Sequence, residues 1–138
     1  KIIFTYMKKS ILVLVLFAFV GCKSAKENAN IIVITSKKEV VVNDYEFVIN
    51  KIISDSRCPE GTNCIWAGEI VMELSVLQNK EIKETLVLTF SPKTRDENLA
   101  WFGKYIPKDK KLIKYKISPS KTEQQLELKD YKIELILE

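Results

Sequence analysis

Short runs of alternating apolar and polar residues constrain the fold of this chain more than any other feature of its sequence. In residues 69–77, EIVMELSVL, the apolar side chains of Ile70, Met72, Leu74 and Val76 occupy every second position, and acidic or hydroxyl residues are among those between them. Successive side chains of a β-strand point to opposite faces of the sheet. The run therefore predicts an antiparallel strand with one face in the core and the other in water.

Similar runs recur along most of the chain and are separated by turn-forming residues. We expect further strands over residues 31–35, 39–43, 45–53, 84–90, 112–117 and 131–137, with residues 125–128 as a shorter candidate. Asn43-Asp44 and Gln78-Asn79-Lys80 are typical of turns. The chain has neither an internal repeat nor a long helical period. These features predict an all-β fold, namely a small single-domain antiparallel β-sandwich or partly open barrel of about seven or eight strands.

Residues 91–109, SPKTRDENLAWFGKYIPKD, interrupt this pattern and carry three large aromatic residues, Trp101, Phe102 and Tyr105. The central RDENLAWFGK predicts one or two helical turns that end at Gly103. Two interpretations are open, because long loops often carry function. The segment is either an aromatic binding loop or a plug that covers one end of the sandwich. We favour the plug, since small β domains seldom expose such large apolar groups.

The amino-terminal region has the pattern of a signal peptide. Lys8 and Lys9 precede an unbroken apolar run of ten residues, 11–20. This run is far shorter than the roughly 20 apolar residues that a transmembrane helix needs. It matches the apolar region of an export signal instead. Residues 1–6 precede a plausible start at Met7, and we interpret them as a non-native extension.

The end of this region, Phe19-Val20-Gly21-Cys22, resembles the cleavage site of bacterial lipoproteins, although Phe19 stands where leucine is usual. The resemblance implies that the signal peptide, residues 1–21, is removed and that Cys22 is lipidated. More than one acyl chain on Cys22 would anchor the protein stably in a membrane. The polar residues 22–30 would then form a lipid-anchored tether, and residues 31–138 the β domain.

The resemblance to lipoproteins also predicts a location. Lys23 follows Cys22 where many lipoproteins retained in the inner membrane carry aspartate, which implies the outer membrane of a bacterial cell envelope. Glu27 is the only acidic residue of the tether, so a strong acidic signal for surface export is missing. We therefore expect the periplasmic face of the membrane.

The remaining cysteines, Cys58 and Cys64, predict one disulfide, because an exported chain reaches an oxidising compartment. The alternatives fit less well. A closed zinc site needs four ligands, and the chain has no histidine and no second cysteine pair, so we predict no metal and no other cofactor. A redox-active pair is typically spaced Cys-x-x-Cys. We expect Trp66 to lie buried beside the disulfide, and Gly68 to suit a bulge or a close approach of two backbones.

The surrounding stretch, DSRCPEGTNCIWAGEIVMEL, resembles a recurring motif of small exported bacterial proteins whose function is uncharacterised. The motif consists of Asp-Ser-Arg-Cys-Pro followed by Cys, an aliphatic residue, Trp-Ala-Gly and a strand. The resemblance implies a fold and no mechanism. Within this stretch the candidate binding residues are Asp55, Arg57, Glu60, Asn63, Trp66 and Glu69.

Charge and composition narrow the possible functions. The net charge is +4, but residues 1–21 hold three lysines and no acidic residue, so +1 remains for the rest of the chain. A nearly neutral domain lacks the basic surface that nucleic acids require, and we expect no nucleic-acid partner. The chain has no histidine, which is the usual general base for a serine or cysteine nucleophile. We therefore predict no catalytic residues.

We predict a binding or interaction module in the envelope, anchored to the membrane by its lipid and with an envelope protein or a glycan as partner. Two alternatives remain open. One is a hydrolase or carbohydrate-active protein that uses carboxylates, for example Glu69 with Glu73 or Asp96 with Glu97. The other is a purely structural lipoprotein. Carboxylates converging in a pocket would favour the enzyme.

Overall fold

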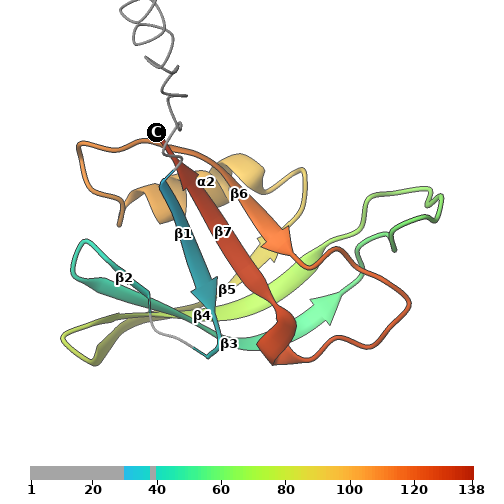
Figure 1. Ribbon diagram of the computed structural model, residues 1–138, viewed down its shortest axis with the longest axis horizontal. Coiled ribbons are helices and arrows are strands. Elements are labelled where there is room, and N and C mark those ends of the chain that lie inside the picture. Colours follow the sequence, from blue (N-terminus) through green and yellow to red (C-terminus); the bar gives the residue numbers. More distant parts are fainter. Residues whose placement is uncertain (1–29, 38–39) are drawn as a thin grey trace, which may run out of the picture.

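A computed structural model describes residues 30–37 and 40–138. The predicted signal peptide, the lipidation site Cys22 and the tether up to residue 29 lie outside the described residues. The described chain contains seven strands, one α-helix and one 3₁₀ helix (Figure 1). In chain order they are β1 (Asn30–Thr35), β2 (Val40–Val42), β3 (Tyr45–Asp55), β4 (Ile70–Gln78), β5 (Glu81–Phe90), α2 (Arg95–Gly103), β6 (Leu112–Ser118), η1 (Leu128–Asp130) and β7 (Lys132–Leu137).

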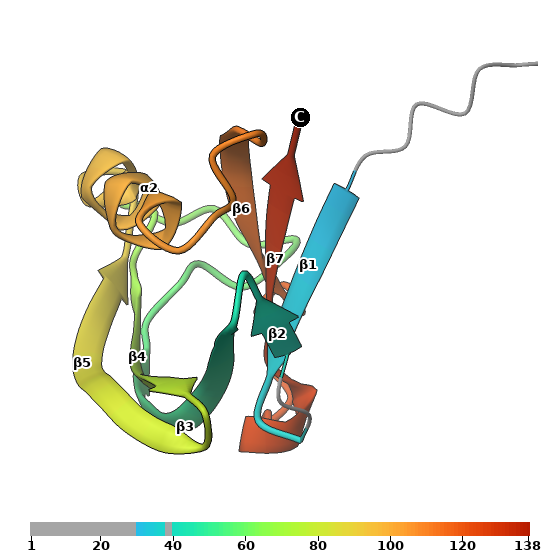
Figure 2. The same cartoon turned by 90° about the vertical axis from the view of Figure 1, so that its left-hand side faces the viewer.

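The strands form two antiparallel sheets that face each other as two layers (Figure 2). One sheet has the order β2-β3-β4-β5, and the other has the order β1-β7-β6. The predicted all-β sandwich is therefore confirmed. Strands β5 and β6 are both edge strands, and α2 contacts both of them.

The core lies between the two sheets. The four apolar residues predicted to share one face of β4 are all fully buried, as the alternation required. Phe47 and Ile49 from β3 pack in the same core, and β1 and β7 contribute from the opposite sheet. The buried residues of the opposite sheet are Ile34, Ile133, Leu135 and Leu137.

Two tight turns set the register of the larger sheet. Asn43 and Asp44 join β2 to β3 with φ angles of 49° and 70°, and Asn79 and Lys80 join β4 to β5 with φ angles of 52° and 66°. Two consecutive positive φ angles are the signature of the type I′ turn, which matches the twist of a hairpin. Both turns were predicted from the sequence.

The shorter strand candidate, residues 125–128, is wrong. Leu128 instead begins the 3₁₀ helix η1. The Glu127 N–H donates to Asp130 Oδ2 at 2.9 Å, and the Asp130 N–H donates to the Glu127 carbonyl oxygen at 2.9 Å. These reciprocal bonds satisfy the backbone within a single turn, so the segment does not pair with a strand.

Helix α2 confirms the plug interpretation of residues 91–109. Trp101 and Phe102 are buried, and their rings contact Phe47 at centroid distances of 6.1 and 6.2 Å. Tyr105, after the helix, is partly buried and donates its hydroxyl to Glu84 Oε2 at 2.6 Å. Burial and the charge and hydrogen bond of Glu84 raise the pKa of Tyr105 to about 12. These aromatic residues serve the core, and the alternative of an exposed aromatic binding loop is not supported.

Candidate binding face at the disulfide loop

The candidate site lies at the loop between β3 and β4, residues 56–69, which we call the disulfide loop. It projects beyond the sheets at the same end of the molecule as the β6–β7 connection (Figure 1). The Ser56 N–H donates to the Glu69 carbonyl oxygen at 2.8 Å, and the Cys58 N–H donates to the Ala67 carbonyl oxygen at 3.2 Å. The loop thus continues the β3–β4 hairpin for a short distance.

The predicted disulfide between Cys58 and Cys64 is present, with the two Cα atoms 5.9 Å apart. It closes the tip of the loop. The Glu60 N–H also donates to the Lys121 carbonyl oxygen at 2.8 Å, which ties the tip to the β6–β7 connection. The tip is therefore held both by a covalent bond and by a neighbouring segment.

Gly68 permits the close packing of the two sides of the loop. Its φ is +70°, in the left-handed region, and a Cβ atom added there would lie 2.0 Å from the Ser56 carbonyl oxygen. Only glycine meets both demands. The predicted close approach of two backbones at this residue is confirmed.

Asp55 and Arg57, two of the candidate binding residues, form the base of the loop and interact internally. Arg57 Nε and Nη2 donate to the two carboxylate oxygens of Asp55 at 2.9 and 2.8 Å. Arg57 Nη1 donates to the Pro119 carbonyl oxygen at 3.0 Å, and the Tyr131 hydroxyl donates to Asp55 Oδ2 at 3.1 Å. The Lys121 ammonium donates to the Asp55 carbonyl oxygen. We call Asp55, Arg57 and Tyr131 the clasp.

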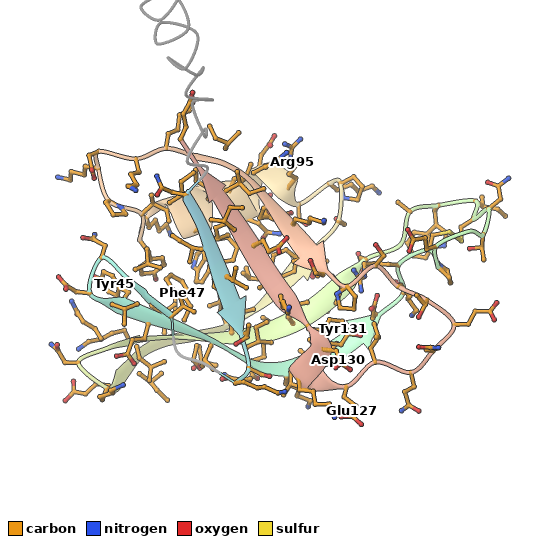
Figure 3. The ribbon with its side chains drawn as sticks, in the orientation of Figure 1. Tyr45, Phe47, Arg95, Glu127, Asp130 and Tyr131 are labelled. Carbon is orange, nitrogen blue, oxygen red and sulfur yellow. A yellow bond between two sulfur atoms is a disulfide. The ribbon has the colours of Figure 1, made fainter. Side chains whose placement is uncertain are left out.

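The clasp changes the pKa values of its members. Burial opposes the charged form of Asp55, but the hydrogen bonds and charge of Arg57, with the hydroxyl of Tyr131, outweigh it and hold the pKa of Asp55 below that of an ordinary aspartate. Burial and the charge of Asp55 raise the pKa of Tyr131 above that of an ordinary tyrosine. Asp55 is therefore a charged structural anchor, and its carboxylate is only 8% exposed. Figure 3 shows Tyr131 close to Asp130 and Glu127, at the start of β7.

The prediction that Trp66 is buried beside the disulfide is wrong. Its side chain is 68% exposed, and the neighbouring Ile65 is fully exposed. The physical reason is the position of the loop, because it projects beyond both sheets and no second layer covers its tip. Glu60 and Asn63 are also exposed, whereas Glu69 lies half-buried at the loop base. Of the six candidate binding residues, Asp55 and Arg57 belong to the internal clasp, three are exposed on the loop, and Glu69 lies half-buried at its base.

A hollow of about 330 Å³ opens between the ends of β5 and β6, beside the disulfide loop. We call it the inter-sheet hollow. Its apolar lining includes Ile70, Phe90, Tyr115 and Ile117, and two arginines, Arg57 and Arg95, also line it. Phe90 and Ile70 are buried core residues, so the hollow gives access to the edge of the core.

A second hollow, of about 240 Å³, is bordered by Trp66, Glu69 and Lys93. We call it the tryptophan hollow. It shares with the inter-sheet hollow the lining residues Ala67, Gly68, Ser91 and Pro92. The two hollows are therefore adjacent, and with the exposed Ile65 and Trp66 we call them the candidate binding face.

Sequence reasoning missed several residues of this face. Arg95, Tyr115 and Pro92 come from α2, from β6 and from the β5–α2 connection, all distant in sequence from the cysteine motif. Nothing in their local sequence marks them, since only the folding of β5 and β6 beside the loop brings them there. Tyr131 was predicted as part of a strand, and its contact with Asp55 was not foreseen.

The acidic pairs proposed for catalysis do not converge in the described structure. Asn50 Nδ2 donates to Glu73 Oε1 at 3.3 Å, whereas Glu69 borders the tryptophan hollow. Asp96 and Glu97 are exposed in the first turn of α2, where their negative charges interact favourably with the positive end of the helix dipole. Among residues 30–37 and 40–138, no group of three or more His, Cys, Asp or Glu residues is placed to hold a metal ion.

The fold and this face define a small disulfide-containing β-sandwich with an exposed apolar loop tip. Comparison of the chain with models of protein families, with curated proteins and with solved structures finds no match. Neither helix of the described chain has the length and apolar character needed to span a bilayer.

Proposed function

We propose that this protein is a lipid-anchored β domain of the bacterial cell envelope that binds a partner protein through the disulfide loop. The observation that carries the proposal is the exposure of Ile65 and Trp66 on a loop whose base and tip are held in place. Binding hot spots are enriched in tryptophan, and they gain affinity when their conformation is fixed in advance.

The polar contacts of the loop support this interpretation. Asp55 and Arg57 are engaged with each other and with the β6–β7 connection, so their charges are used to hold the loop. The side chains of Ile65 and Trp66, by contrast, are exposed and form no hydrogen bond or ring contact with another described residue. Ile65 and Trp66 are consecutive in the sequence and both exposed, so a partner that covers them removes their apolar surface from water, which favours association.

The proposed location rests on the lipoprotein-like signal. With Cys22 acylated, the domain would stay at the periplasmic face of the outer membrane, and Lys23 favours delivery there. Confinement near the membrane raises the effective concentration of envelope partners, so even a small interface would suffice. Fractionation of inner and outer membranes tests the location, and recovery only with inner-membrane markers would contradict it.

The function is tested by crosslinking in native envelopes followed by purification of the full-length protein and mass spectrometry. The Trp66→Ala and Ile65→Ser variants should lose a protein partner that the wild type captures. Ile82→Ser is the control, because Ile82 is 65% exposed, close to the 68% of Trp66, but lies in β5 beside the β4–β5 turn and outside the disulfide loop.

Three results would contradict the proposal. A partner captured equally by all variants would exclude the loop tip as its binding site. If the wild type captures glycan and no protein, and prior digestion of peptidoglycan abolishes the capture, a protein partner would be excluded. Absence of any specific partner in the wild type would favour a purely structural lipoprotein.

A further inference from the structure

We infer that the inter-sheet hollow binds the carboxyl-terminal residue of an extended polypeptide whose last side chain is apolar. The apolar side chain would occupy the hollow, and its terminal carboxylate would face Arg95. This inference rests on the proposed function and names the part of the partner that is recognised.

The lining of the hollow supports an apolar group together with an anion. Two of its lining residues, Ile70 and Phe90, are buried core residues, and Tyr115 and Ile117 add apolar surface from β6. Of the side chains that line it, two are cationic and none is acidic. Carboxylates are the natural partners of such arginines, because the guanidinium donates two parallel hydrogen bonds.

The two arginines differ in the charge that they offer. Arg57 is neutralised by the carboxylate of Asp55, although three hydrogen bonds leave two of its five N–H donors without a partner in the described chain. Arg95 is exposed at the first position of α2 and forms no ion pair with any other described residue. Arg95 therefore supplies the unpaired positive charge. Figure 3 labels it at the start of α2.

The strand edges favour an extended peptide as the occupant. Strands β5 and β6 both end their sheets, and the hollow is lined by residues of both. At β5 the Thr89 carbonyl oxygen already accepts hydrogen bonds from Thr94 and Asn98, so β6 offers the edge for a peptide. An extended peptide can add main-chain hydrogen bonds to a strand edge while a side chain enters a pocket. The adjacent tryptophan hollow gives the preceding residue a place against Trp66.

The size of the hollow argues against a long lipid chain. A volume of about 330 Å³ lies at the lower end of the range for small-ligand pockets, about 300 to 1,000 Å³. It suits a single side chain with its carboxylate. Lys93, beside the tryptophan hollow, adds a second positive charge near the path of the peptide, while Glu69 on the same rim favours a polar or basic residue further from the terminus.

The test is calorimetric titration of the full-length protein in detergent with two probes, acetyl-Ala-Ala-Leu with a free carboxylate and its carboxamide. We expect the carboxylate to bind at least about tenfold more tightly, as the loss of a charge-assisted contact predicts. The Arg95→Gln variant should remove that difference by weakening the carboxylate alone. Arg95→Lys should retain part of it. Lys108→Gln is the matched control, because it removes an exposed charge outside the hollow.

A steric variant tests the location independently of charge. Ala67 is exposed and lines both hollows, so Ala67→Trp should fill the space and weaken both probes. Its far-ultraviolet circular dichroism and its denaturation midpoint should be those of the wild type, because the added indole alters the near-ultraviolet spectrum by itself. Equal binding of the two probes, an unchanged preference in Arg95→Gln, or no binding of either probe at about 1 mM would each overturn the inference.

Isovalerate serves as a probe for small free acids. If it binds as tightly as the tripeptide, the site recognises free acids and the inference of a peptide terminus is wrong. Failure of this inference can be distinguished from failure of the proposed function. Loss of the envelope partner in Trp66→Ala without any peptide binding would refute this inference alone, whereas peptide binding with an unaffected partner would refute the role of the loop tip.

Discussion

At the scale of single residues, Asp55 joins three parts of the chain that are distant in the sequence. Its carboxylate accepts hydrogen bonds from Arg57 in the disulfide loop and from Tyr131 just before β7, and Arg57 in turn donates to the Pro119 carbonyl oxygen. Removing one partner of such a pair leaves the other buried and uncompensated. The side chain of Arg57 is only 18% exposed.

The Asp55→Asn variant should therefore lower the free energy of unfolding by about 2 kcal/mol, because it leaves Arg57 without its counter-charge. Urea denaturation followed by circular dichroism measures the change. The control is Glu81→Gln, which breaks the exposed pair with Lys83 and should cost less than about 0.5 kcal/mol. Equal midpoints for the two variants would contradict the role of the clasp.

The same residue predicts a pH dependence. The lowered pKa means that folded Asp55 binds its proton less tightly than it does in the unfolded chain. The charge of Asp55 therefore contributes fully to the free energy of unfolding above about pH 4, and this contribution is lost as the pH falls through the lowered pKa. The difference in unfolding free energy between wild type and Asp55→Asn should be constant between about pH 7 and pH 5 and should shrink below about pH 4. A constant difference throughout would show that charge is not involved.

Two glycines of the disulfide loop provide a matched comparison. Gly68 and Gly61 both have positive φ angles, of +70° and +80°, but only at Gly68 would a Cβ atom meet the backbone. Gly61→Ala should lower the free energy of unfolding by about 1 kcal/mol, because alanine is strained in the left-handed conformation. Gly68→Ala should cost at least about 1 kcal/mol more, because the backbone of Ser56 must move. Thermal denaturation compares them, and equal costs would disprove the close approach.

The error for Trp66 shows what residue patterns leave undetermined. A tryptophan beside a disulfide is buried only where another layer covers it, and the local sequence does not reveal whether the loop lies over the sheets or beyond them. The contact between Asp55 and Tyr131 has the same cause. Each residue was assigned to its segment, but the distance between two segments depends on the packing of the whole chain.

At the scale of elements, alternation identified the strands because each sheet has one face in the core. Strand β4 is the clearest case, since all four predicted inward residues are buried. Helix α2 was predicted from composition and from Gly103, where the element ends. The candidate binding face depends instead on how β5, β6 and the disulfide loop meet, and no periodicity within a single element encodes this.

The disulfide is an element-scale constraint on the loop tip. Replacement of both Cys58 and Cys64 by serine should lower the free energy of unfolding by about 2 to 2.5 kcal/mol, because a small closed loop is released in the unfolded chain. The far-ultraviolet circular dichroism should remain that of the β-sandwich, since neither residue belongs to the core cluster. An unfolded double variant would show that the loop is required for the fold itself.

The β4–β5 turn offers a stabilising substitution. Lys80 has a φ of 66° and occupies the second position of a type I′ turn, where glycine is favoured. Lys80→Gly should raise the free energy of unfolding by about 0.5 kcal/mol. Lys83→Gly, inside β5, should lower it by about 0.5 to 1 kcal/mol. Lys80→Gly also removes the ion pair of Lys80 Nζ with Glu46 Oε1, 3.3 Å apart, so both variants are measured by thermal denaturation in about 1 M salt, which screens an exposed pair. A loss of stability in Lys80→Gly under these conditions would contradict the assigned turn.

At the scale of the whole molecule, the anchor and the domain should be separable. The core cluster of the described chain is formed between Ile34 and Leu137, whereas the predicted lipid attaches at Cys22. The Cys22→Ala variant should therefore leave the membrane fraction and keep the near-ultraviolet circular dichroism of a folded domain. Membrane fractionation after a high-salt wash is the measurement. Firm retention would refute the lipid anchor, and a soluble but unfolded variant would refute an independent core.

The pairing of β1 with β7 has a consequence for the order of folding. Asn30 pairs with Leu137, so this sheet joins the two ends of the described chain, and β7 is its central strand. Strands β2 to β5 each pair only with strands that are next to them in the sequence. Their pairing closes short loops, so it can form early. If the amino-terminal signal directs export as proposed, a chain that emerges from the export channel amino end first can build the four-stranded meander early, while β1 waits without a partner until β7 arrives. During that interval the core face of the meander is uncovered, so export would be the stage at which this protein most needs a chaperone.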